Sequence, residues 1–130
     1  PRVEVVVCGD TAGLPPAVEV AAYRIAHEAV TNVRRHARAT TVLVRLSVET
    51  DPAGRGELRL TVSDDGVGLP ATPRRGVGTA SMRERAQEAG GSCVITSRPG
   101  GGTEVAVRLP LSPSARDDAL RAPGAIGARP

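Results

Sequence analysis

Four polar residues of one segment follow each other at helical spacing and could do chemistry together. Glu28 and Asn32 are four residues apart, so in a helix their side chains stack on one face. Arg35 and His36 extend this stripe by one turn. The stripe borders an apolar face, where a ligand could sit between the helix and a loop. The alternative is a solvated face, since charged residues at this spacing are common on surface helices.

A second group is a pair of carboxylates followed by glycine, in the segment D-D-G-V-G-L-P at residues 64–70. Asp64 follows an apolar run directly, so we expect it at the end of a strand, where glycine permits a close approach of the backbone. A carboxylate placed there can accept a hydrogen bond from an exocyclic amine. We expect Asp65 to be only its neighbour. The alternative is an ordinary Asp-Gly turn.

A third group is the segment R-R-G-V-G at residues 74–78, which leads into a predicted helix. Free backbone N–H groups at a helix start, with arginines nearby, favour phosphate. The spacing of Gly76, Gly78 and Ser81 superficially resembles a dinucleotide fingerprint, but a glycine-rich loop precedes Gly76 where that motif requires a strand. A Walker A loop is absent from the sequence.

Hydrophobic periodicity predicts the elements that must position these groups. Apolar residues recur with helical spacing from Val18 to Val33, which predicts a helix from Pro15 or Pro16 to about Ala37. The predicted strands are 3–7, 40–49, 57–63, 92–97 and 103–109, and a second helix spans 79–89. Two pairs of strands are joined by turn-forming segments and should form hairpins. This order predicts an α/β two-layer sandwich, with the two helices on one face of the sheet.

Composition excludes several classes of protein. Among the 130 residues, 17 are basic and 14 acidic, and the net charge of +3 is too small to indicate nucleic-acid binding. Tyr23 is the one aromatic residue, so base-stacking platforms are excluded and the core must be aliphatic. No apolar run approaches the roughly 18 residues of a membrane span, which predicts a soluble chain. Cys8 and Cys93 lie far apart, which indicates neither a disulfide scaffold nor a zinc site.

The ends of the chain suggest a domain with an appendage. After Pro110 the composition shifts to Pro, Ala, Ser and Arg without periodicity, so we expect a domain at 1–110 and a flexible tail at 111–130. The chain begins without an initiator Met or a signal segment, and we therefore expect a piece of a longer protein.

Four segments together resemble the GHKL ATPase family. They are HEAVTNVRRHA (27–37), DDGVGLP (64–70), RRGVGTASMRERA (74–86) and GGGTEVAVRLP (100–110), similar in turn to its N box, its two glycine boxes and its terminal Gly-Thr segment. The similarity is greatest to the catalytic ATP-binding domain of bacterial sensor histidine kinases of the nitrate-sensor and lipid-fluidity-sensor subgroup. It implies the Bergerat sandwich, a mixed, mostly antiparallel sheet covered on one face by helices, with a flexible lid at about 69–77. Thr79 and Ser81 depart from the Leu and Gly frequent in the family.

The resemblance assigns roles at the metal and phosphate end of an ATP site. Asn32 would bind Mg²⁺ through its side-chain carbonyl, while phosphates and water supply the other ligands. Glu28 would be the catalytic acid residue, either polarising a water or orienting metal-bound water. Arg35 would contact phosphate, and His36 would lie beside it at the phosphate or ribose edge.

The resemblance also assigns the adenine end. Asp64 would accept a hydrogen bond from the adenine amine, supported by Thr103. The remaining positions would let the lid backbone approach the nucleotide: Gly66, Gly68, Gly76, Val77 and Gly78.

The resemblance implies a function in two-component signalling. The domain would transfer the γ-phosphate of ATP to a histidine on a separate dimerisation domain, from which a response regulator receives it. It would be cytoplasmic and contact neither nucleic acid nor membrane. The alternatives are a protein serine kinase of the anti-sigma type and a degenerate, non-catalytic nucleotide-binding module. His27-Glu28 also fits a phosphoacceptor pattern, but a predicted strand precedes this helix and a hairpin with a glycine box follows it, which favours an ordinary side chain for His27.

Overall fold

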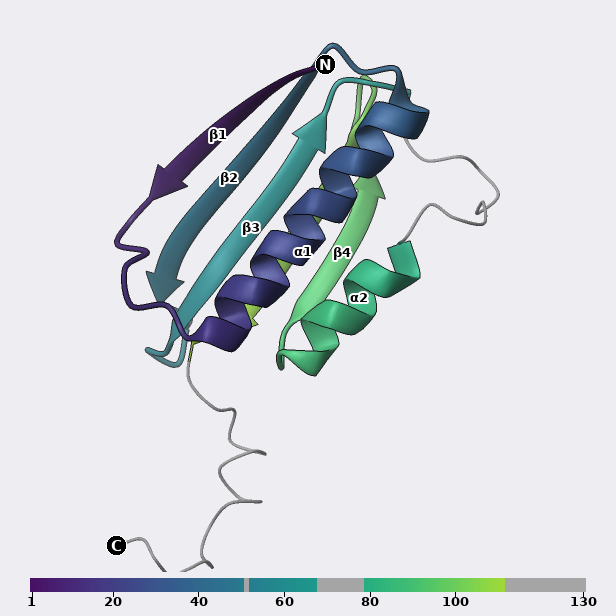
Figure 1. Cartoon of the computed structure of the whole chain (residues 1–130). Coiled ribbons are helices and arrows are strands. Elements are labelled where there is room, and N and C mark those ends of the chain that lie inside the picture. Colours follow the sequence, from purple (N-terminus) through teal and green to yellow (C-terminus); the bar gives the residue numbers. More distant parts are fainter. Residues whose placement is uncertain (51, 68–78, 112–130) are drawn as a thin grey trace, which may run out of the picture.

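The protein is a five-stranded sheet with two helices, seen in a computed structural model that describes residues 1–50, 52–67 and 79–111 (Figure 1). The strand order is β1-β2-β3-β5-β4. β1 pairs in parallel with β2, and the other pairs are antiparallel. The strands are β1 (Arg2–Cys8), β2 (Thr41–Thr50), β3 (Gly56–Asp64), β4 (Ser92–Ser97) and β5 (Thr103–Pro110).

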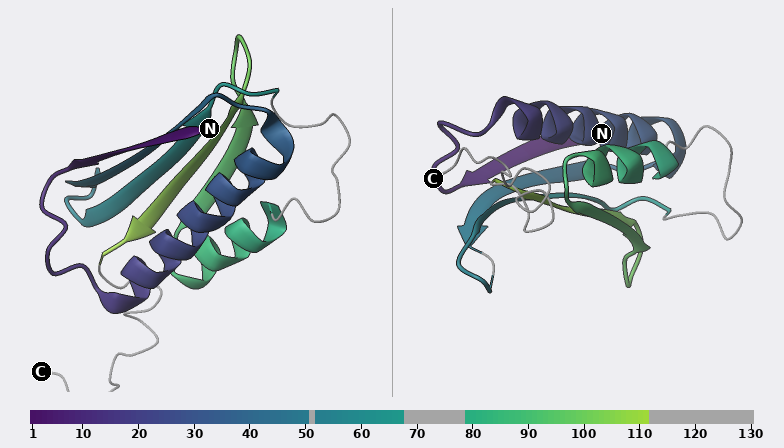
Figure 2. Two further views of the ribbon diagram at one scale, coloured as in Figure 1. Left: turned by 45° about the horizontal axis from the view of Figure 1, so that its top comes forward. Right: turned by 90° about the horizontal axis from the view of Figure 1, so that it is seen from below.

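The helices are α1 (Pro16–Asn32), the π-helical segment η1 (Val33–Ala37) that continues it, and α2 (Thr79–Glu88). Both α1 and α2 lie on one face of the sheet (Figure 2). Pro16 is tolerated in the first turn because the N–H that proline lacks has no helical partner there. The sandwich predicted from the sequence, mixed, mostly antiparallel and covered on one face, is therefore confirmed.

An aliphatic core fills the space between helices and sheet. Ile25 of α1 and Leu58, Leu60 and Leu109 of the sheet are fully buried. Alternation along β3 turns Leu58, Leu60 and Val62 toward the helices. The same alternation makes Asp64, the last residue of the strand, the next position on the buried face. Burial of apolar surface, the dominant favourable contribution to folding, thus also fixes which way this carboxylate points.

The predicted elements are all present, and both hairpins form between the predicted strand pairs. The predicted helix ending near Ala37 is also present, but its last five residues are π-helical. Most of the predicted lid and tail, residues 68–78 and 112–130, lies outside the described residues. Within the described ranges, no helix is long and apolar enough to cross a membrane.

Candidate functional site

One end of the molecule collects the segments that carry the predicted site. α1 and η1 end there, β3 ends there, and the turn between β4 and β5 lies at the same end (Figure 1). Asn32, partly buried, is the last residue of α1, and Asp64 is the last residue of β3. The fold therefore brings to one end two side chains that are 32 positions apart in the sequence.

Asp64 is a buried carboxylate at the edge of the core, with 2% of its surface exposed. Its Oδ1 accepts a hydrogen bond from the Gly66 N–H at 2.7 Å, and within the described part of the chain it makes no ion pair. By contrast, the other buried carboxylate, Glu57, pairs with Arg59 at 2.6 Å. A buried anion without a counter-charge is costly, so the arrangement suits a ligand that donates a hydrogen bond to it.

The start of β5 packs closely against this carboxylate's backbone. The last described pair of the β3–β5 ladder is Ser63 with Glu104, so Thr103 stands one step further, beside Asp64. Gly102 has a φ of +96°, and a Cβ there would lie 1.8 Å from the Asp64 carbonyl oxygen. Only glycine fits this approach. The backbone register thus places Thr103 next to Asp64, and the support of Asp64 by Thr103 in adenine binding stays a prediction.

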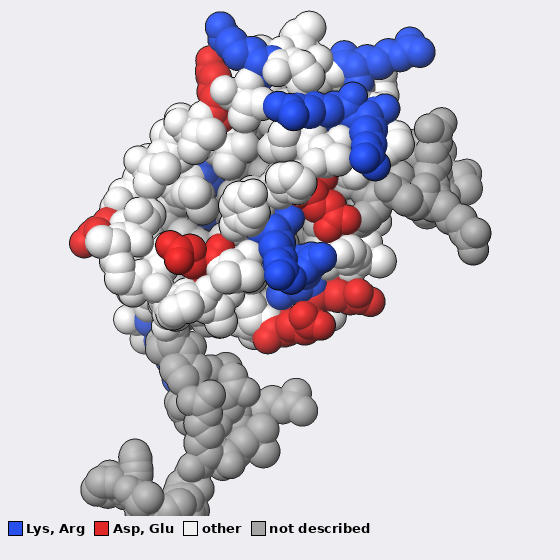
Figure 3. Space-filling view, viewed as in Figure 1, with Lys and Arg blue, Asp and Glu red and all other residues white. Residues whose placement is uncertain are grey.

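The π-helical segment carries the predicted phosphate contacts. Arg34, Arg35 and His36 are exposed on it, and arginines gather over this end of the molecule (Figure 3). The segment ends at Arg38, which adopts a left-handed conformation with φ of 52°. π-Helical turns occur frequently at functional sites, because they change the direction of side chains relative to a regular helix. Arg35 and His36 therefore do not simply continue the α-helical stripe of Glu28 and Asn32.

Glu28 is partly exposed and contacts α2. Its Oε1 lies 3.9 Å from Nε of Arg85, an ion pair that bridges the two helices. Nε of Arg85 is buried and has no hydrogen-bond partner in the described residues. The sequence interpretation did not single out Arg85. The sequence feature that could have identified Arg85 is its place in the second glycine box segment, one helical turn after Met82. The buried side chain of Met82 fixes the orientation of α2.

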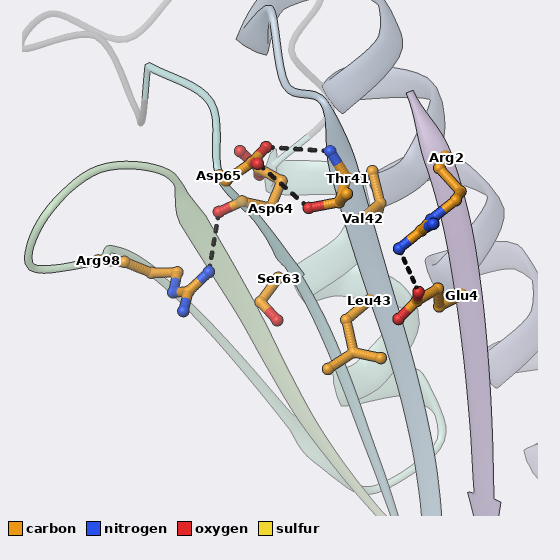
Figure 4. A pocket seen from close by; sticks show the side chains of 9 residues that line it. All are labelled: Arg2, Glu4, Thr41, Val42, Leu43, Ser63, Asp64, Asp65 and Arg98. Carbon is orange, nitrogen blue, oxygen red and sulfur yellow. Dashed lines mark hydrogen bonds and ion pairs between the residues drawn. The ribbon is translucent and has the colours of Figure 1, made fainter.

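Asp65 is more than a neighbour of Asp64. Its Oδ1 accepts hydrogen bonds from the backbone N–H groups of Thr40 at 2.8 Å and Thr41 at 3.1 Å, and its Oδ2 accepts from both hydroxyls (Figure 4 shows the Thr41 side). The Thr40 hydroxyl foremost, with the other three donors, holds the pKa of this carboxyl well below its usual range. From the sequence we expected Asp65 to be only a neighbour of Asp64, and its contacts with Thr40 and Thr41, which only tertiary structure creates, were not predicted.

A hollow of about 290 Å³ is lined in part by Asp64 and Asp65 (Figure 4). Thr41, Leu43 and Ser63 line it, and these alternate with core positions, so they point to the sheet face away from the helices. Arg98 also lines it and donates to the Asp64 carbonyl at 3.0 Å. Asn32 and Glu28 do not line this hollow, so it is not the predicted space between helix and lid. The lid residues Gly68, Gly76, Val77 and Gly78 lie outside the described part of the chain.

The residues present fit a cation that is coordinated mainly by phosphate and water and only partly by the protein. No group of three or more His, Cys, Asp or Glu side chains able to hold a metal occurs in the described ranges. Magnesium commonly takes only one or two protein oxygens and completes its shell with phosphate and water. The side-chain carbonyl of Asn32, with Glu28 one turn before it, supplies oxygens of this kind.

Comparison with known proteins identifies the family. Residues 17–113 match the family of histidine kinase-, DNA gyrase B- and HSP90-like ATPases. The sensor histidine kinase LiaS of Bacillus subtilis is 36% identical over 111 residues, which are 84% of this chain and 29% of that protein. The nitrate/nitrite sensor protein NarX of Escherichia coli is 37% identical over 86 residues, 65% of this chain and 14% of that protein.

Solved structures agree with this result. The blue-light activated histidine kinase of Erythrobacter litoralis has a TM-score of 0.64 at 29% identity, over 86% of this chain and 36% of that chain. The ATP binding domain of PrrB from Mycobacterium tuberculosis has a TM-score of 0.58 at 27% identity, over 88% of this chain and 83% of that chain.

The chain belongs to this ATPase family, and its sequence and fold are those of the ATP-binding catalytic domain of sensor histidine kinases. It spans less than a third of the length of the curated relatives named above. The family hypothesis drawn from the four motifs is confirmed, and these relatives are sensor kinases, not anti-sigma serine kinases.

Proposed function

We propose that this chain binds ATP with Mg²⁺ at the end formed by α1, η1 and β3, and delivers the γ-phosphate to a histidine on a separate helical domain. The observation that carries the proposal is Asp64, buried at the end of β3 without an ion pair in the described residues, in a chain of this ATPase family. Its carboxylate accepts a hydrogen bond from the adenine amine, with Thr103 beside it. Gly66 allows the chain to approach the base.

The phosphate end is assigned to α1, η1 and the segment before α2. Asn32 holds the cation, which neutralises phosphate charge and makes the γ-phosphorus more electrophilic when bound. Arg35 contacts phosphate, and His36 lies at the phosphate or ribose edge. Gly76, Val77 and Gly78, with Gly68, bring lid backbone to the nucleotide. These assignments rest on the motif match and on the common end of the fold at which Asn32 and Asp64 lie.

In the proposed reaction, an imidazole nitrogen of the acceptor attacks the γ-phosphorus while the bond to the β–γ bridging oxygen breaks and ADP leaves. The protein's contribution is position and charge neutralisation. Glu28 already lies beside the cation Arg85. The nucleophile is the imidazole of the acceptor histidine. We therefore assign to Glu28 the role of orienting water in the site.

The remaining parts of the proposal concern the whole protein. The acceptor histidine lies on a dimerisation domain outside this chain, and a response regulator then takes the phosphoryl group. The site of action is the cytoplasm. We assign residues 1–110 to the catalytic domain; all but the first residue of the predicted tail at 111–130 lies outside the described residues.

The test of nucleotide binding uses a fluorescent ATP analogue with the 130-residue chain, with and without Mg²⁺. We expect a Mg²⁺-dependent signal, and a Kd raised about tenfold by Asp64→Asn through a weakened hydrogen bond to the base. Asn32→Ala should remove most of the Mg²⁺ dependence. Asp10→Asn is the matched control, since Asp10 is exposed and caps only its own turn, accepting from the Ala12 N–H at 2.9 Å. Absence of any signal at high micromolar protein contradicts the proposal.

The test of phosphoryl transfer adds the separate dimerisation domain of a relative and radiolabelled ATP. Labelled product should be lost in acid and stable in base, as phosphohistidine is. An acid-stable product would instead indicate serine phosphorylation.

A further inference from the structure

The carboxylate of Asp65 ends the hydrogen-bond ladder between β2 and β3. Val42 with Asp64 is the last pair of that ladder. Beyond it the Asp65 side chain replaces a backbone acceptor, taking the N–H groups of Thr40 at 2.8 Å and Thr41 at 3.1 Å. The two hydroxyls add further donors to Oδ2. β3 can therefore leave the sheet after Asp64 without leaving the first N–H groups of β2 unsatisfied.

These hydrogen bonds join two parts of the proposed site. Thr40 comes two residues after Arg38, the left-handed residue that ends η1, and its carbonyl accepts from the Arg2 N–H at 2.9 Å. On the other side, Asp65 is covalently between Asp64 and Gly66, whose N–H donates to the Asp64 carboxylate. Asp65 thus attaches the Asp64–Gly66 turn, which orients the Asp64 side chain, to the segment that follows η1.

We propose that Asp65 is a positioning residue that sets the adenine specificity of the site by holding the Asp64–Gly66 turn against the start of β2. The inference rests on the proposed function. Four donors from Thr40 and Thr41 engage the carboxylate, so Asp65 acts through Asp64. The adenine amine donates to Asp64, whereas hypoxanthine carries a carbonyl oxygen at that position and cannot. Displacement of the turn therefore weakens binding of ATP and leaves that of inosine triphosphate almost unchanged.

The hydrogen bonds also stabilise the ionised form of the Asp65 carboxylate, the form that accepts hydrogen bonds with both oxygens. They hold the pKa of Asp65 well below its usual range, because the four donors stabilise the ionised carboxylate. Geometry, more than charge, is what the turn requires. An asparagine can accept both N–H groups with its oxygen and donate its own N–H to a threonine hydroxyl.

The experiment measures the Kd of ATP and of inosine triphosphate for the wild-type chain, Asp65→Ala and Asp65→Asn. We expect the wild type to prefer ATP, and Asp65→Ala to raise the Kd of ATP about tenfold while that of inosine triphosphate changes less than about twofold. Asp65→Asn should keep most of the preference. Asp10→Ala is the matched control, because it removes an exposed carboxylate and one local hydrogen bond more than 50 residues before Asp65 in the sequence. It should leave the ratio of the two Kd values unchanged.

The outcomes separate this inference from the proposed function. An unchanged preference in Asp65→Ala, or an equal rise of both constants, overturns the positioning role while leaving ATP binding intact. A wild type that binds neither nucleotide overturns both proposals. If Asp65→Ala fails to fold, Thr41→Val decides, because it removes one hydroxyl and keeps both backbone donors. It should lower the preference about threefold, and no change would count against the inference.

Discussion

Replacing Gly102 by alanine should damage both the stability of the fold and the adenine end of the site. A Cβ at this residue would lie 1.8 Å from the Asp64 carbonyl oxygen, and real Cβ contacts stay beyond 3.0 Å, so these two atoms must move apart by at least 1.2 Å (3.0 − 1.8). The left-handed φ of +96° adds backbone strain. Strain of about 1–3 kcal/mol and overpacking of about 1–3 kcal/mol together lower the free energy of unfolding by about 2–6 kcal/mol.

Urea denaturation followed by circular dichroism measures the stability, and the fluorescent ATP analogue measures binding. Two glycines serve as controls. Gly91→Ala produces the same 1.8 Å clash, with the Arg108 carbonyl oxygen at the opposite end of the strands, and should destabilise without weakening ATP binding. Gly100→Ala meets nothing within 4 Å at φ +84°, so it should cost about 1 kcal/mol from backbone strain alone.

Only Gly102→Ala should also raise the Kd of ATP, because only there does the clash displace Asp64. We expect a rise of about tenfold among the molecules that remain folded, the effect of losing one hydrogen bond. Equal stability for Gly102→Ala and Gly100→Ala would refute the close approach of the strands. A Gly91→Ala variant with the same loss of ATP affinity would refute the local effect on Asp64.

Three further predictions follow from burial and charge. Ile25→Ala should lower the free energy of unfolding by about 2–5 kcal/mol in urea denaturation, because Ile25 is fully buried, while Val20→Ala at a half-exposed position changes it by less than about 0.5 kcal/mol. Of the two thiols, Cys8 is exposed and Cys93 is buried with its pKa raised by burial, so a thiol reagent at pH 8 should label one per chain rapidly and the second only on unfolding; rapid labelling of both would contradict the buried position. The pKa of Asp65 is lowered on folding, so its contribution to stability is present above the unfolded value of about 3.9 and is lost as pH falls below it; the difference in urea midpoint between the wild type and Asp65→Ala should shrink from pH 5 to pH 2, and a constant difference would argue against the hydrogen bonds.

The sequence predicted most of the fold because its patterns are local. Apolar spacing from Val18 to Val33 gives a helix, and Leu58, Leu60 and Val62 alternate as a half-buried strand must. The π-helical end of the first helix was not predicted, since no periodicity distinguishes five residues of π-helix from one more α-helical turn.

The site was predicted in part. Motif order placed Asn32 and Asp64 in one family pattern, and the fold brings them to the same end of the molecule. The contacts of Asp65 with Thr40 and Thr41, and of Arg85 with Glu28, were missed. Each joins residues 24 or more positions apart through side chains of ordinary surface types, and nothing in local spacing shows such a contact.

The amino-acid sequence by itself determined which segments are helix or strand, which faces are apolar and which polar residues follow them. Those properties depend on neighbours within a few positions, where propensity and periodicity act. The tertiary structure alone decided that the carboxylate of Asp64 is buried at 2% exposure while that of Asp65 turns the other way to β2. Two adjacent aspartates look alike in a sequence. They differ here because Asp64 is the last residue of β3 and falls on its buried face, whereas Asp65 lies beyond the strand, where the N–H groups of Thr40 and Thr41 donate to its carboxylate.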